Sequence, residues 1–296
     1  MSTFTAKRLR FTFSLANAAA TFEGTNSNTF VVTGLRAAVH MNGSGFPAFP
    51  EARAVINGLK QDDMNALTAL SFQMEGVTRN VFIVDADSGD GWSTVFAGEI
   101  VEAGPDYSNM PAVGFHILAR VLFFFSINPA PVTAYTGATS VASIVSNIAA
   151  RMGKAFENNG VTTVLDSPYL PGTLAEQLRS VCQQAGIDCY NDPAGNVIAI
   201  TPKYQPRRVP RWVLSPAIGL VGYPKLESRG YIQARSVFNP AFRFGGPVRI
   251  EGSDLPRANG DWMIGVLSHT LESETPGGAW FSDSLCYPAG SLPPIR

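Results

Sequence analysis

The chain has 296 residues, a formal net charge of −1 and only 15% charged residues, together with 28 glycines and 21 prolines. The length allows two or three domains, each with its own core. Few charges and many turn formers are typical of a strand-and-turn protein whose surface meets other protein chains, and equally of an ordinary β domain with a Ser/Thr/Asn-rich exterior. A net charge near zero provides no electrostatic attraction to DNA, so we expect no specific nucleic-acid binding.

Cysteine and histidine are too few and too scattered to predict a disulfide framework, a zinc site or a cofactor site. The chain contains Cys182, Cys189, Cys286, His40, His116 and His269. We therefore expect no metal or cofactor, and folding in a reducing cytoplasm. The longest apolar run, residues 120–127, is far shorter than the roughly 20 residues of a membrane helix, so no membrane association is expected.

The N-terminus imitates a signal peptide, because basic residues precede an Ala-rich stretch that ends at Ala20. Apolar and polar residues alternate strictly from Leu9 to Leu15, however, and this is the periodicity of a strand. We predict a first strand over residues 4–16. Further strands are predicted over residues 26–33, 36–40, 51–59, 80–86, 92–102 and 110–118, with a short helix over 60–72 and a break in the third strand at 42–45.

The character of the sequence changes near Pro129. Apolar residues at helical spacing predict an amphipathic helix over residues 139–152. Thr173 and Glu176 form a capping-box pattern at the start of a second helix, which ends at Gly186. A hairpin over residues 187–201 completes a helix–helix–hairpin unit.

The last third begins with a Pro-rich basic linker, residues 203–211, and ends with a Pro-rich tail, residues 288–296. Between them, alternating apolar and polar residues predict four short strands, with a tight turn at 276–278 joining the last two. The strands cover residues 231–237, 247–252, 262–269 and 280–286. Four such strands describe a small antiparallel barrel or sandwich.

The order of these pieces resembles the trimeric tail hub proteins of phage baseplates. The C-terminal match consists of a Gly-x-Pro strand opening, an Asn-Pro turn, a Gly-x-x-Val-x-Ile strand and a closing hairpin, at Gly222–Pro224, Asn239–Pro240, Gly246–Ile250 and His269–Trp280. An N-terminal match has a strand that ends in Gly-Leu, a small helix, a strand and then Phe-x-Gly-x-Ile at Phe96–Ile100. Each motif is ordinary hairpin chemistry, and the ordered set carries the resemblance.

The resemblance implies a mainly β fold in which two small antiparallel β-barrels flank an α/β insert. The implied domains are an N-terminal barrel over residues 1–128, the insert over 129–202 and a C-terminal barrel with its linker and tail over 203–296. It further implies a structural virion protein: a homotrimer, assembled in the host cytoplasm, that joins the hexameric tail tube to a threefold central spike and meets other baseplate or tape-measure proteins. Some hub chains continue into a further barrel and a needle, and we expect this chain to use a separate spike.

No credible catalytic motif is found, and we expect no enzyme. Asp85, Asp87 and Asp90 resemble a calcium loop, but no bidentate Glu follows and a hairpin turn is favoured. Glu99 and Glu102 are three apart on a strand and are predicted to point to opposite faces, which disfavours a glycosidase pair. A further candidate, His269, is interpreted as a hydrogen-bonded structural residue.

The candidate partner-binding residues are Arg207, Arg208 and Arg211 in the linker and Pro293, Pro294, Ile295 and Arg296 in the tail. The three arginines would also be explained as a solvated linker. The tail is interpreted as an extended arm, docked on a neighbour.

Two other classes remain open at this point. A secreted, β-rich glycan-binding or hydrolytic protein would make the N-terminus a true signal peptide and pair Cys182 with Cys189. A tail-associated cell-wall hydrolase is the second alternative. Neither accounts for two matched barrels placed around an α/β insert.

Overall fold

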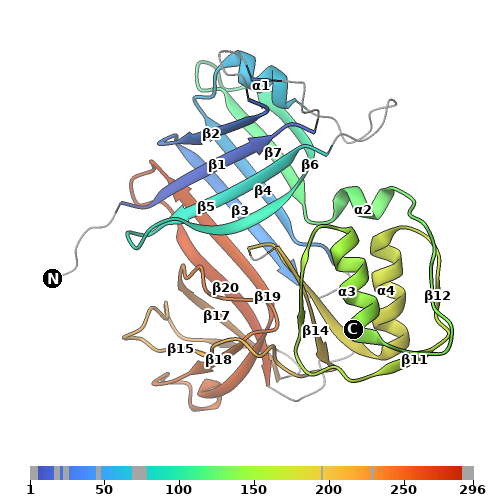
Figure 1. Ribbon diagram of the computed structural model, residues 1–296. Coiled ribbons are helices and arrows are strands. Elements are labelled where there is room, and N and C mark those ends of the chain that lie inside the picture. Colours follow the sequence, from blue (N-terminus) through green and yellow to red (C-terminus); the bar gives the residue numbers. More distant parts are fainter. Residues whose placement is uncertain are drawn as a thin grey trace.

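Strands dominate the molecule. A computed structural model describes residues 6–16, 21–22, 27–44, 48–68, 79–194, 196–227 and 230–288 (Figure 1). Thirteen strands form one large sheet. These are β1 (Arg8–Ser14), β2 (Thr29–Thr33), β3 (Ala37–Ser44), β4 (Glu51–Asn57), β5 (Val81–Asp87), β6 (Ser93–Asp106), β7 (Gly114–Arg120), β15 (Trp212–Leu214), β16 (Lys225–Leu226), β17 (Ile232–Val237), β18 (Pro247–Ile250), β19 (Gly260–Ser273) and β20 (Trp280–Pro288).

The sheet runs in the order β16-β17-β20-β19-β3-β4-β7-β6-β5-β1-β2, with β18 and β15 attached beside β19. Neighbours along this path are antiparallel, and β15 is parallel to β18. The 14-residue strand β19 joins the two halves of the chain, because its first part pairs with β18 and its last part pairs with β3 from Val266↔Ser44 to Ser273↔Ala37.

The expected pair of barrels is therefore replaced by one continuous sheet. Among the described residues its path ends at β2 on one side and β16 on the other, and no barrel closes. Alternating polarity has the same period in an open sheet and in a closed one, so the sequence pattern does not distinguish them. The predicted break at 42–45 is also wrong, since β3 continues through Gly43 to Ser44 while it pairs with β19.

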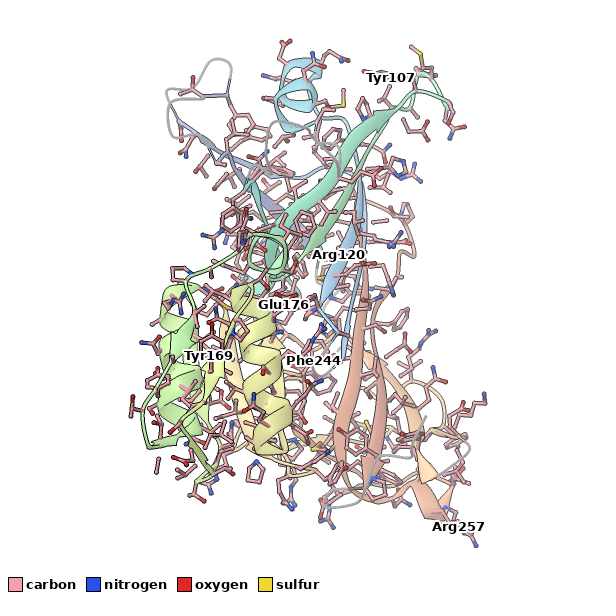
Figure 2. The ribbon with its side chains drawn as sticks, turned by 90° about the vertical axis from the view of Figure 1, so that its right-hand side faces the viewer. Tyr107, Arg120, Tyr169, Glu176, Phe244 and Arg257 are labelled. Carbon is pink, nitrogen blue, oxygen red and sulfur yellow. The ribbon has the colours of Figure 1, made fainter. Side chains whose placement is uncertain are left out.

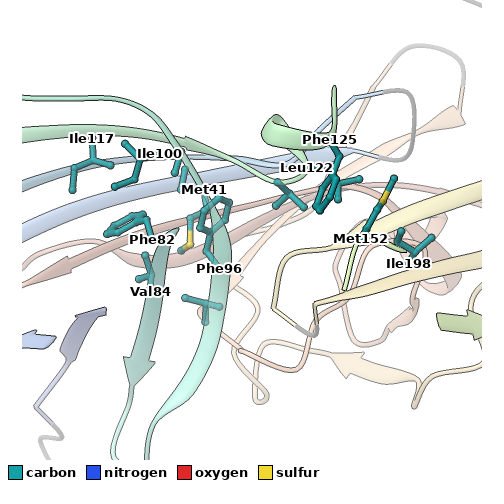
Figure 3. Packing of buried hydrophobic residues seen from close by; sticks show 14 of the residues in the cluster. Met41, Phe82, Val84, Phe96, Ile100, Ile117, Leu122, Phe125, Met152 and Ile198 are labelled. Atoms are coloured by element: carbon teal, nitrogen blue, oxygen red, sulfur yellow. The ribbon is translucent and has the colours of Figure 1, made fainter. Parts of the chain in front are cut away.

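Alternation along the strands places aromatic side chains on one face of the sheet (Figure 3). The ring of Phe82 stacks on Phe11 and Phe13, with centroids 5.9 and 5.3 Å apart. The same apolar cluster continues through Leu122 and Phe125 into the insert. Burial of these side chains, at about 25 cal/mol per Å² of apolar surface, therefore also fixes the insert to the N-terminal half.

The insert, residues 129–202, has its own secondary structure. A three-stranded sheet consists of β10 (Ala155–Asn158), β14 (Val197–Pro202) and β13 (Ile187–Asp192), in that order. Helices α3 (Val141–Arg151) and α4 (Leu174–Ala185) pack together, and two short ribbons pair β8 (Thr133–Ala134) with β12 (Tyr169–Leu170) and β9 (Ala138–Ser140) with β11 (Val164–Asp166). The predicted capping box at Thr173 and Glu176 is confirmed.

The short strands β8, β9, β11, β12, β15 and β16 were not predicted, and three other local elements also differ from the sequence expectations. Helix α1 (Gln61–Leu67) is shorter than the predicted 60–72, whose last four residues lie outside the described ones. Helix α2 (Phe123–Ile127) was not predicted, and the Glu99 carboxylate accepts a hydrogen bond from the Phe123 N–H at its start. Strand β10 joins β14 in parallel, a pairing that local periodicity does not reveal.

At the junction between the two halves, Gly43 is predicted to tolerate no larger side chain. An added Cβ at Gly43 would lie 2.4 Å from the ring of Phe244, which is buried. We expect Gly43→Ala to lower the free energy of unfolding by about 1–3 kcal/mol, the usual cost of overpacking. Urea unfolding measures this. Gly104→Ala is the matched control, because its Cβ would meet nothing within 4 Å, and an equal loss in both variants would contradict the prediction.

Candidate assembly surfaces

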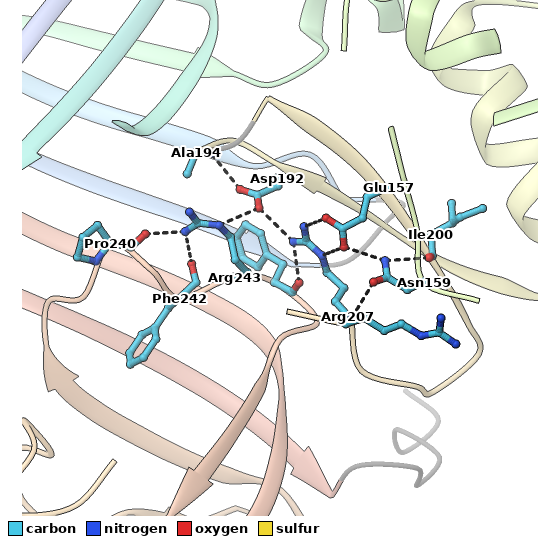
Figure 4. Close-up of polar contacts among 11 residues, drawn as sticks. Glu157, Asn159, Asp192, Ala194, Ile200, Arg207, Pro240, Phe242 and Arg243 are labelled. Atoms are coloured by element: carbon cyan, nitrogen blue, oxygen red, sulfur yellow. Dashed lines mark hydrogen bonds and ion pairs between the residues drawn. The ribbon is translucent and has the colours of Figure 1, made fainter. Parts of the chain in front are cut away.

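The basic linker contains a buried arginine. Arg207 is 3% exposed, and its guanidinium forms a two-point ion pair with Glu157, with Nη2–Oε2 at 2.7 Å and Nε–Oε1 at 3.1 Å. Its Nη1 donates to the Asp192 carboxylate at 3.1 Å and to the Phe244 carbonyl at 3.3 Å (Figure 4). One side chain from the linker therefore joins two strands of the insert to the C-terminal half.

A second arginine completes this cluster. Arg243 Nε lies 3.2 Å from the same Asp192 oxygen, and Arg243 Nη1 donates to the backbone carbonyls of Pro240 and Phe242. Asn159 donates to Glu157 and accepts from the backbone N–H of Arg208. Two buried or half-buried carboxylates and two guanidiniums thus satisfy each other in a region with little solvent.

The ionisation of these groups follows from their contacts. The hydrogen bond from Arg207 holds the pKa of Glu157 below its ordinary value. Burial opposes the charge of Arg207, but the hydrogen bonds that it donates to Glu157 and the negative charges of Asp192 and Glu157 outweigh burial and raise the arginine pKa. Glu157 and Arg207 therefore carry opposite charges at neutral pH, and their two-point pair fixes the position of the insert.

The structure separates the predicted partner-binding residues. The side chain of Arg207 is engaged inside the molecule, whereas Arg208 and Arg211 are exposed. The Arg211 guanidinium lies 3.1 Å from Asp261 in a surface ion pair. The tail residues Pro293, Pro294, Ile295 and Arg296 lie outside the described residues. Sequence reasoning treated the three arginines alike because a single charged residue carries no signal of its burial.

Exposed apolar side chains, rather than charges, mark the remaining candidate surfaces. A C-terminal edge strip lies along the outer side of β17, where Val221 N–H donates to Arg235 and Val237 N–H donates to Gly219. It consists of Ile218 (60% exposed), Val221, Tyr223 (62% exposed), Leu226 and Val237. At the opposite end of the sheet, Val31 is exposed on the edge strand β2. The sequence signal that could have found Ile218, Val221 and Tyr223 is the uncharged stretch 212–224, and a similar uncharged stretch surrounds Val31.

Another exposed apolar pair lies at the tip of the β6–β7 hairpin. Figure 2 shows Tyr107 at one end of the molecule and Arg257 at the other, with the long strands between them. Tyr107 exchanges hydrogen bonds with Gln61 of α1, and Met110 is 70% exposed. The hairpin therefore presents an apolar tip that is held by α1.

The residues considered for chemistry are engaged in structural contacts. Asp87 accepts hydrogen bonds from the Gly89 and Gly91 N–H groups, and Asp85 accepts from Arg10 and Thr94, as expected of a hairpin turn. Over the described ranges, no group of three or more His, Cys, Asp or Glu side chains could hold a metal ion. No helix found in the described segments is long and apolar enough to span a membrane.

The prediction for Glu99 and Glu102 is wrong in one respect. A β-bulge inserts Val101 between the pairs Ile100↔Ala119 and Glu102↔Leu118, so both glutamates lie on the same side of β6. Glu99 is nevertheless buried and lies 3.5 Å from Arg79, whereas Glu102 is exposed. Because Glu99 is buried beside Arg79 and Glu102 is exposed, the two carboxylates do not form one site.

The interpretation of His269 is confirmed. Its Nδ1 lies 2.8 Å from the Ser282 hydroxyl, and its ring meets Phe238 edge-on. Cys182, Cys189 and Cys286 are all buried free thiols.

Solved structures with the same fold come from phage tails and a secretion system. A tail protein from Neisseria meningitidis MC58 aligns with a TM-score of 0.62 at 10% identity, covering 95% of this chain and 97% of that one. The 43 kDa tail protein of prophage MuSo2 from Shewanella oneidensis gives 0.60 at 10% identity, covering 94% and 96%. The E. coli c3393 protein, a type VI secretion component described as similar to the T4 bacteriophage tail proteins gp27 and gp5, gives 0.60 at 10% identity, covering 93% and 76%.

The fold is thus that of this class of tail proteins. No curated protein matches the sequence. Residues 63–276 match the family described as Baseplate hub gp41, and the chain belongs to that family.

The buried ion cluster predicts that one linker arginine is structural. Arg207→Met leaves Glu157 and Asp192 without their shared cation, and we expect the free energy of unfolding to fall by about 3 kcal/mol. The loss is at the lower end for a broken buried pair because Arg243 still faces Asp192. Arg211→Met, which breaks a surface pair, is the matched control and should cost less than about 1 kcal/mol. Chemical denaturation compares the two variants, and similar losses would contradict the prediction.

His269 predicts a pH dependence of stability. Burial, followed by the charge of Arg243, lowers the pKa of His269 from its ordinary 6.5 to about 4. The unfolded chain takes up a proton near pH 6.5, and the folded chain does not until about pH 4. Keeping His269 neutral and buried therefore costs no stability above pH 6.5. As the pH falls from 6.5 to 4, protonation of the unfolded chain lowers the free energy of unfolding. The expected loss is about 3 kcal/mol. Denaturation from pH 7 to 4 measures it, and an equally steep fall in His269→Gln would contradict the assignment.

Proposed function

We propose that this protein is a structural component of a phage virion, a homotrimeric baseplate hub that joins the tail tube to a central spike. Membership of the baseplate hub family is the observation that carries this proposal. Tape-measure or other baseplate proteins are further partners in it. Assembly takes place in the host cytoplasm, and the protein performs no catalysis.

The two ends of the sheet support association between copies. An open sheet leaves unpaired backbone groups on its edge strands, and these favour pairing with another chain. Here β2 carries the exposed Val31 at one end, and the C-terminal edge strip covers the other. Two different surfaces on one chain suit a head-to-tail contact, which closes into a ring when the rotation between copies is a simple fraction of a turn.

The proposed organisation keeps three units, residues 1–128, 129–202 and 203–296. In support, the insert carries a three-stranded sheet that is separate from the thirteen-stranded one. The two outer units share the large sheet through β3 and β19, and in the proposal they act as two barrel-like halves of one ring segment. The exposed Arg208 and Arg211 are proposed as partner contacts in the linker.

The fold also bears on the secreted alternative. Strand β1 lies between β2 and β5, with register pairs from Arg8↔Asp87 to Ser14↔Val81. Cleavage after Ala20 would remove a strand whose Phe11 and Phe13 are fully buried. This favours retention of the N-terminus, and hence the hub over a secreted glycan-binding protein.

Light scattering across a dilution series tests the proposal. We expect the mass of a trimer, and complex formation when tube and spike proteins are added. Ile218→Glu, in the C-terminal edge strip, should reduce the trimer because it places a charge in an apolar contact. Ile127→Glu, an exposed isoleucine on α2, is the matched control. A monomer that binds neither tube nor spike would overturn the proposed function.

A further inference from the structure

Two of the three cysteines lie together in the insert, and the proposed function does not use them. Cys182 lies in the last turn of α4, Cys189 is the third residue of β13, and α4 packs on β13. Both cysteines belong to the apolar cluster that contains Leu178 and Val181 of α4, whereas Tyr190, the next residue of β13, belongs to the other cluster. Because side chains alternate along a strand, Cys189 points from β13 toward α4.

The chain between the two thiols makes a tight reversal. Gly186 ends α4 with a φ of 62°, and its N–H donates to the carbonyls of Cys182 and Gln183. Six residues separate the two cysteines, and their thiols share a hydrogen bond. A hydrogen bond brings the two sulfur atoms into contact, so a disulfide between them requires rotation of side chains rather than rearrangement of the backbone.

A hollow of about 270 Å³ opens beside the two cysteines. Cys182 is 5% exposed and Cys189 is 3% exposed, and both contribute to the lining. The charged side chains of the lining are Arg179, Asp188 and Lys203. Two cations and one carboxylate give the hollow an excess of positive charge, which attracts a small anionic reagent toward the thiols.

We propose that Cys182 and Cys189 form a dithiol site that reacts with a small anionic disulfide of the glutathione type and closes a reversible disulfide between α4 and β13. The site goes beyond the proposed function and does not depend on the trimer. It requires no secretion either, because the reactant is the folded chain with β1 in place. A reducing cytoplasm keeps both thiols reduced, and the disulfide forms when the folded protein meets an oxidising solution.

The reaction consists of two thiol–disulfide exchanges. The hydrogen bond to Cys182 and burial raise the pKa of Cys189, so Cys189 keeps its proton while Cys182 attacks first. The Cys182 thiolate forms a mixed disulfide with one half of glutathione disulfide and releases the other half as a thiolate. Cys189 then attacks the Cys182 sulfur and releases the second glutathione. The two glutathiones take up the two protons and two electrons that the cysteines lose.

Treatment of the folded, full-length protein with glutathione disulfide tests the site. We expect the intact mass to fall by two hydrogens, digestion to give a product in which Cys182 and Cys189 are linked, and dithiothreitol to restore both thiols. Cys182→Ser and Cys189→Ser should form no internal disulfide. Cys286→Ser is the matched control and should oxidise at the wild-type rate, because Cys286 is also buried but lies in the other apolar cluster.

Two results would overturn the inference. One is a folded protein whose thiols stay free while the urea-unfolded chain forms the disulfide under the same conditions. The other is a disulfide that involves Cys286 or joins two chains. Neither result bears on the proposed function, which light scattering tests separately.

The charge of the hollow supplies a second readout. Lys203→Glu should slow oxidation by glutathione disulfide several-fold, because it replaces an exposed cation of the lining with an anion. Oxidation by hydroxyethyl disulfide, which is neutral, should keep its wild-type rate in the same variant. An equal effect on both reagents, or an effect on neither, would overturn the assignment of an anionic reagent.

Discussion

The antiparallel pairing of β19 with β3 is the interaction on which the rest of the structure depends. It brings residues 266–273 beside residues 37–44 and converts two groups of strands into one sheet. Each half alone would expose an edge strand at this position. The junction is tightly packed, with Phe244 against Gly43, so the relative position of the halves is set by contact as well as by backbone hydrogen bonds.

The insert is held at this junction by two different kinds of contact. Apolar side chains such as Leu122, Phe125 and Met152 continue the core of the N-terminal half into it. The Arg207 cluster attaches the same insert to the C-terminal half by charge. Apolar burial is non-directional, whereas a two-point arginine–carboxylate pair requires a specific geometry. Together the two kinds of contact define both the position and the orientation of the insert.

These contacts explain how a chain with few charges can serve in an assembly. Its ionic groups are largely used within the molecule, at Arg207, Arg10 and Arg235, where they pair with Asp or Glu partners. The exposed apolar positions lie mainly at the edges of the sheet, at the tip of the β6–β7 hairpin and on the insert. Contacts between such surfaces depend on shape and apolar burial, which suits a permanent structural role better than a transient encounter.

The sequence by itself determined most of the long strands of the large sheet, the hairpin and both helices of the insert, the capping box at Thr173 and the structural role of His269, because each depends on neighbours close along the chain. The ordered motifs also indicated the hub family. Only the tertiary structure decided that β19 joins β3, that Arg207 is buried while Arg208 is exposed, and that the bulge at Val101 turns Glu102 to the side of Glu99. These features depend on pairings between distant residues, which alternating polarity cannot specify.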